Sequence, residues 1–230
     1  MGMGIPSQLP QIISAIGGLG TAAFGLVDAT KVFGGGVNRI GFHRIKGVVA
    51  RLTPAAPTAG LSQAKIVDTL RANWYSGTDL ASQKSIANTL IKQNLNTENA
   101  AALAAKTAVD GDLLHSAAVK TGSGTPLAQN ETDLMLRFDF VVSALLDEAY
   151  QDADQAYTNG TRVVAAGFAI VLAFFGGWAL LGGGFVHYLK SNELWLALIA
   201  GVLATPLAPV AKDLSSALAS VVNSLQASKK

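Results

Sequence analysis

The stretch that decides the fold is VVAAGFAIVLAFFGGWALLGGGFV, residues 163–186, which contains no Asp, Glu, Lys, Arg or His in 24 consecutive positions. As an α-helix, with a rise of about 1.5 Å per residue, it is roughly 36 Å long. The hydrocarbon core of a bilayer is about 30 Å thick, so this helix is long enough to cross it. Arg162 precedes the stretch, and Tyr188 and Lys190 follow it, as is typical of membrane interfaces. We therefore predict a transmembrane helix here.

A second apolar run follows after a short connection. Residues 194–210, LWLALIAGVLATPLAPV, carry no charge. Pro206 and Pro209 each lack a backbone donor and are expected to bend this helix. Because only residues 187–193 join the two runs, we expect them to be antiparallel neighbours. Residues 163–210 are therefore predicted to form a C-terminal transmembrane hairpin.

A third apolar run is N-terminal and richer in glycine, which lowers its helix propensity. Residues 9–27 carry no charge. A cleaved signal peptide is one alternative, but residues 1–27 contain none of the basic residues that begin such a peptide. We expect a retained membrane helix over 9–33, with an interfacial or re-entrant helix as the main alternative.

The composition agrees with a membrane protein. Only 14% of the 230 residues are charged and the mean hydropathy is +0.37, whereas soluble domains carry about 25% charge. A formal net charge of +2 gives no indication of nucleic-acid binding. The chain has no cysteine, which excludes disulfides, thiolate metal sites and cysteine nucleophiles.

The cations predict an orientation. Residues 31–51 hold five cations and no acid: Lys31, Arg39, Arg44, Lys46 and Arg51. Arg162 precedes the hairpin, and Lys229 and Lys230 end the chain. By the positive-inside rule, the N-terminus lies outside, and residues 31–162 and the C-terminus are cytoplasmic, in an inner or plasma membrane.

Two regions are expected on the cytoplasmic side. Residues 34–60, with Gly34 to Gly36 at their start, are interpreted as a basic Gly/Pro linker whose cations face anionic lipid headgroups. Residues 61–160 are predicted to form a small extramembrane helical bundle. Its first three helices are expected to be capped by Ser62, by Thr78 or Asp79, and by Thr97.

The bundle is predicted to end in a long amphipathic, acidic helix that begins after an N-cap at Asn130. Its apolar stripe consists of Leu134, Phe138, Val141 and Leu145. The acidic residues that follow are interpreted either as a solvated face or as a site for a cation or basic partner. Residues 211–230 are predicted to be an amphipathic C-terminal tail.

Small residues recur at every fourth position of the apolar runs. The hairpin carries two such series: Ala165, Ala169, Ala173 and Gly177, then Ala197, Gly201 and Thr205. Small residues let helix backbones approach closely in lipid. They predict close packing, either within the hairpin or between subunits.

No catalytic, cofactor or metal site is predicted. The three histidines, His43, His115 and His187, are far apart in sequence, and the apolar runs contain no ionisable residue. We expect an all-α, polytopic integral membrane protein that is not an enzyme. Its predicted role is that of a structural or assembly subunit that forms homo-oligomers or anchors a larger complex in the lipid bilayer, without nucleic acid. An oligomeric pore or channel is the alternative.

Overall fold

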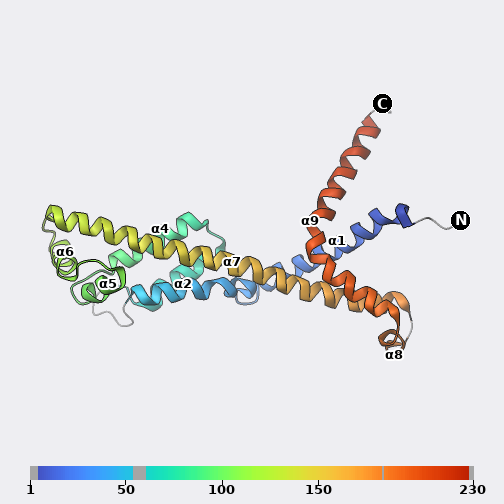
Figure 1. The fold of residues 1–230 in the computed structure, drawn as a ribbon, viewed down its shortest axis with the longest axis horizontal. Coiled ribbons are helices and arrows are strands. Elements are labelled where there is room, and N and C mark those ends of the chain that lie inside the picture. Colours follow the sequence, from blue (N-terminus) through green and yellow to red (C-terminus); the bar gives the residue numbers. More distant parts are fainter. Residues whose placement is uncertain (1–4, 54–60, 183, 228–230) are drawn as a thin grey trace. The chain divides into compact units, whose positions relative to one another are not determined.

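The computed structural model describes residues 5–53, 61–182 and 184–227, and the side chains of residues 11–53, 61–182 and 184–209. Every regular element in this part of the chain is helical, so the all-α prediction is confirmed (Figure 1). The elements are α1 (Ile5–Thr30), a 3₁₀ turn η1 (Gly36–Asn38), α2 (Arg39–Leu52), α3 (Gln63–Ser76), α4 (Leu80–Gln93), α5 (Ala100–Thr107), α6 (Gly111–Ser123), α7 (Gln129–Leu181), α8 (Phe185–Leu189) and α9 (Asn192–Ala227).

The chain divides into two compact units. The apolar unit comprises Met1–Val37 and Thr158–Lys230, and the bundle unit comprises Asn38–Tyr157. The long helix α7 contributes its first part to the bundle unit and its last part to the apolar unit.

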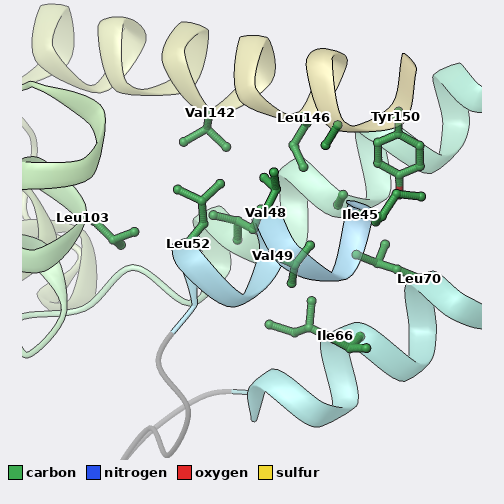
Figure 2. Close-up of a cluster of buried hydrophobic side chains, with 14 of the residues drawn as sticks. Ile45, Val48, Val49, Leu52, Ile66, Leu70, Leu103, Val142, Leu146 and Tyr150 are labelled. Atoms are coloured by element: carbon green, nitrogen blue, oxygen red, sulfur yellow. The ribbon is translucent and has the colours of Figure 1, made fainter. Parts of the chain in front are cut away.

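The bundle unit has a core of large apolar side chains. Figure 2 shows Val48 and Val49 of α2 between Leu146 of α7 and Ile66 of α3. α2 also lies close to α7, because Gly41 has no side chain: a Cβ there would be 2.3 Å from the carbonyl oxygen of Ala153.

The prediction of a linker over 34–60 is wrong for residues 39–52, which form α2. The apolar residues Phe42, Ile45, Val49 and Leu52 recur every three or four positions, and all are buried. Burial of this stripe supplies the stability that a short helix lacks alone. Gly34, Gly35 and Gly36, all with positive φ, lie in the turn between α1 and α2, as expected of glycine. Residues 54–60 lie outside the described part of the chain.

The predicted caps are confirmed for two helices and wrong for two. Ser62 accepts a hydrogen bond from the Lys65 backbone N–H, and Asp79 accepts one from Ser82. The alanine-rich region expected to start at Thr97 is two helices, because Ala108 adopts a left-handed conformation and Asp110 caps α6. Asn130 lies inside α7 rather than at its N-cap.

Three helices are long and apolar enough to cross a membrane. These candidate spans lie in Gln11–Thr30, Gln129–Leu181 and Asn192–Pro209, with mean hydropathies of 1.6, 2.2 and 1.3. The apolar part of α7 ends at Leu181, earlier than predicted, because Gly182 is left-handed (φ +63°).

The connection to the last helix contains the short helix α8, and α9 continues through Pro206 and Pro209. Figure 1 draws α9 as a bent helix. The side chains of the predicted amphipathic tail, 211–230, lie outside the described residues.

Candidate functional site

Two glycines bring α7 and α9 together within the apolar unit. A Cβ added at Gly201 would lie 2.7 Å from the Cα of Ile170 and 3.2 Å from the carbonyl oxygen of Ala169. A Cβ added at Gly177 would lie 3.1 Å from the Cβ of Ala197. Gly177 of α7 meets Ala197 of α9, whereas Ile170, earlier in α7, meets Gly201, later in α9. The two helices therefore form an antiparallel hairpin.

The helix α1 joins the same packed unit. A Cβ added at Gly20 would lie 2.1 Å from the carbonyl oxygen of Ala204 in α9. The buried side chains of Ala23, Ala169 and Ala204, one from each helix, form a small cluster. Because any side chain at Gly20 would overlap backbone, glycine is what permits this approach.

Most of the predicted small residues take part in these contacts. Ala165, Ala169 and Ala173 are buried, and Gly177 and Gly201 are points of close approach. Ala197 and Thr205 are partly buried. The Thr205 hydroxyl oxygen has no hydrogen-bond partner among the described residues.

Sequence reasoning missed Gly20. On α1 the buried positions are Gly17, Gly20, Ala23 and Val27, which mix spacings of three and four. A strict spacing of four drifts around a helix of 3.6 residues per turn. A search for mixed spacing would have found this face.

An open apolar pocket of about 550 Å³ lies among the same three helices. Its walls include Ile16 and Leu19 of α1, Leu172 of α7 and Leu196 of α9. Among the described residues that line it, Glu193 at the start of α9 is the only charged one. The lining suits an apolar chain and offers no set of groups for acid–base catalysis.

Aromatic side chains cluster where α7 ends and α8 begins. The ring of Phe174 has its centroid 5.2 Å from that of Phe175 and 5.6 Å from that of Tyr188. Trp178 and Phe185 are 5.3 Å apart, close to edge-to-face. Amphipathic aromatic rings are typical of the membrane–water interface.

The predicted stripe on the first part of α7 packs inside the bundle unit. Leu134 and Phe138 are buried in its core. Val141 is only partly buried, and Leu145 packs at the edge of the core. The fully buried positions that follow Phe138 are Val142, Leu146 and Tyr150, one step along from the predicted register.

The acidic residues of α7 pair with lysines of neighbouring helices. Asp147 pairs with Lys84 at 2.5 Å and Asp139 with Lys92 at 2.9 Å. Hydrogen bonds from Asn88 and Lys92 hold the pKa of Asp139 below its usual value, although burial opposes them. The described residues contain no group of three His, Cys, Asp or Glu side chains that fits a metal ion.

Glu131, near the start of α7, is the most strongly held of these acids. It is 3% exposed. Its carboxylate accepts hydrogen bonds from Lys120 Nζ at 2.7 Å, Ser116 Oγ at 2.6 Å and the Ala128 backbone N–H at 2.7 Å. These donors, Lys120 first, lower the pKa of Glu131 to about 2.

The chain matches no protein family, no curated protein and no solved structure.

Proposed function

We propose that this protein is a non-enzymatic integral membrane subunit that assembles or anchors a larger complex. The apolar unit is its membrane part, with α1, the last part of α7 and the first part of α9 as spans. In the proposed topology, residues 31–162 and the C-terminus are cytoplasmic in an inner or plasma membrane.

The observation that carries the proposal is the distribution of side-chain sizes in the apolar unit. Its helices meet mainly through small side chains, and many of its large apolar side chains are exposed, although Tyr188 is buried. The exposed large residues include Val163, Val171, Phe175, Leu180, Trp195, Leu196, Ile199 and Val202. An apolar surface of this extent is unfavourable in water, whereas lipid tails cover it without penalty.

The assembly role is supported by an apolar surface on the bundle unit. Leu136 and Phe140, one helical turn apart on α7, are mostly exposed. Leu136 also borders a groove of about 470 Å³, together with Leu127 and Met135. Large exposed apolar side chains of this kind are unfavourable in water and are typical of surfaces that contact another protein.

The first test is membrane insertion. Because the chain has no cysteine, a single cysteine at Val171 in the apolar unit, or at the exposed Ala144 in the bundle unit, gives one labelling site each. In inside-out vesicles, whose cytoplasmic side faces the medium, we expect a membrane-impermeant thiol reagent to label Ala144→Cys and to spare Val171→Cys until detergent is added. Equal labelling of both without detergent would contradict the proposal.

The second test is assembly. The full chain, extracted in mild detergent, is expected to elute as an oligomer or with partner chains that mass spectrometry identifies. Leu136→Ser with Phe140→Ser is expected to release them, and Arg137→Ser, an exposed control on the same helix, is not. A parent protein that is strictly monomeric and without partners would contradict the role. Steady conductance in planar bilayers would instead favour the pore.

A further inference from the structure

The helix α2 has one buried apolar face and one exposed basic face. Phe42, Ile45, Val48, Val49 and Leu52 point into the bundle unit. The remaining arc of the helix carries five basic residues and no acid: Arg39, His43, Arg44, Lys46 and Arg51. α2 is therefore a rigid support that holds these side chains on one surface.

Four cations of the neighbouring helices are paired with acids, whereas three cations of α2 are not. In the bundle unit, Arg71, Lys84, Lys92 and Lys120 each form an ion pair with an acid. Arg44, Lys46 and Arg51 form none with the described residues. The positive charges of these three residues are thus not neutralised by ion pairs within the described part of the chain.

The surface extends past the end of α2. Lys106 of α5 donates a hydrogen bond from Nζ to the backbone carbonyl of Arg51, which places another exposed cation there. Between the cations, Gly47 and Ala50 are exposed and small. The same arc also carries Ile40, which is partly buried.

Only a short connection joins α1 to α2. Eight residues, 31–38, separate Thr30 from Arg39, so the gap is at most about 30 Å. Within this connection, Val32 and Phe33 are 83% and 81% exposed. Two exposed apolar side chains next to a basic helix are typical of segments that lie at a lipid interface.

We propose that the basic face of α2 binds the phosphate-bearing headgroups of anionic lipids. The proposal rests on the proposed function, because α1 must lie in the bilayer for the connection to bring α2 to its surface. Anionic leaflets attract cations next to membrane spans, and the attraction weakens within a Debye length. A nucleic acid fits the face less well, because α2 exposes no Phe, Tyr or Trp ring for base stacking.

The test uses the full chain in vesicles with a single environment-sensitive thiol label. Gly47→Cys places the label on the basic face, at a position with open space around it. Val171→Cys places it in the proposed span of α7. The vesicles contain phosphatidylcholine alone or phosphatidylcholine mixed with phosphatidylglycerol. A trace of headgroup-linked quencher reports contact of Gly47→Cys, and an acyl-chain quencher reports insertion of Val171→Cys.

We expect quenching at Gly47→Cys to be strong in the anionic vesicles, weak in the neutral ones and suppressed by high salt. Each cation near an anionic surface contributes about fivefold to binding. Arg44→Gln with Lys46→Gln and Arg51→Gln is therefore expected to weaken the preference for anionic lipid by roughly a hundredfold. Arg44→Lys with Arg51→Lys should retain it.

The matched control changes the same charge elsewhere on the bundle unit. Lys65→Gln with Arg71→Gln and Arg137→Gln is expected to leave the lipid preference unchanged. Equal quenching at Gly47→Cys in both vesicles, with Val171→Cys inserted, would overturn this inference alone. If the acyl-chain quencher does not reach the label at Val171→Cys, α7 does not insert. That result would overturn the proposed function and, with it, this inference. Tight binding of an oligonucleotide through the three α2 cations, without a lipid preference, would also overturn the inference.

Discussion

The helices of the two units pack through side chains of different size. In the bundle unit the largest buried side chains are Tyr150, Phe138, Ile45 and Ile66. In the apolar unit the cluster that joins α1, α7 and α9 is made of Ala23, Ala169 and Ala204, and many large apolar residues are exposed, although Tyr188 is buried. Both units are helical, so secondary structure does not account for the difference.

The proposed membrane location of the apolar unit would account for this difference, because lipid and water favour different packing. In water, burial of large apolar side chains drives folding, and polar groups cover the surface. In lipid, apolar surface has no reason to be buried, so close backbone packing through small residues holds helices together. The same amino acid is therefore expected to have a different energetic effect in each unit, which matched substitutions can measure.

The largest effect is expected at the core of the bundle unit. Phe138 is fully buried, and Phe140, two residues along α7, is 72% exposed. Phe138→Ala removes a buried ring and leaves a cavity, so it is expected to lower the free energy of unfolding by about 3–5 kcal/mol. Phe140→Ala is expected to change it by less than about 0.5 kcal/mol. Urea denaturation followed by circular dichroism measures both, and equal losses would show that α7 does not pack as described.

A second pair of substitutions tests the solvent directly. Val171 in the apolar unit and Val119 in the bundle unit are similarly exposed, at 49% and 46%. Val171→Arg places a charge on a surface assigned to lipid and is expected to cost about 2.5–3.5 kcal/mol of insertion free energy. Val119→Arg faces water and should be close to neutral. The fraction of chain retained in alkaline-washed membranes compares them, and a neutral Val171→Arg would remove the distinction between the units.

The third pair tests the glycine contacts of the apolar unit. An exposed helical Gly→Ala change normally stabilises a helix by about 1 kcal/mol. Gly167→Ala is expected to do so, since a Cβ there meets nothing within 4 Å. Gly201→Ala is expected to have the opposite sign, with a loss of about 1–3 kcal/mol, because its Cβ would overlap the backbone at Ile170. Thermal unfolding in detergent measures both, and equal shifts would argue against close packing of α7 with α9.

The sequence predicted the apolar helices and the small-residue contacts of the hairpin because these depend on local composition. Whether an uncharged run is long enough to cross a bilayer can be counted in the sequence. Ala169 and Gly201 were recognisable by their spacing. It did not predict the end of α7, because residues 182–184 are apolar by composition, whereas Gly182 terminates the helix through its backbone conformation.

The bundle unit was harder to predict because its register depends on partners. The apolar stripe of α7 follows Leu134, Phe138, Val142 and Leu146, in steps of four, rather than the predicted heptad. Which residue is buried is decided by α2, α3 and α4, which pack there. The helix α2 was missed because the glycines before it and the prolines after it suggested a linker, although its own stripe of Phe42, Ile45, Val49 and Leu52 was present.

The smallest effect on stability is expected from the dependence of Glu131 on pH, which becomes visible only in acid. Its pKa in the folded chain is about 2, below the model-peptide value of 4.5, so the folded state favours the ionised carboxylate. The resulting stabilisation is complete above about pH 5 and is lost as the pH falls through about 4.5 towards 2. Glu131→Gln is expected to remove this part of the acid sensitivity of the bundle unit, and Glu148→Gln, an exposed acid on the same helix, is expected to retain it.

Because the donors to Glu131 come from α6 and the turn before α7, the loss should appear in the bundle unit and not in the apolar unit. Denaturation curves at successive pH values separate the two responses when each is read from a single tryptophan. One variant keeps only Trp74 in the bundle unit, the other keeps only Trp195 in the apolar unit, and both carry Trp178→Phe. An apolar unit that loses stability over the same pH range would show that its stability also depends on carboxylates, contrary to packing by small residues in lipid.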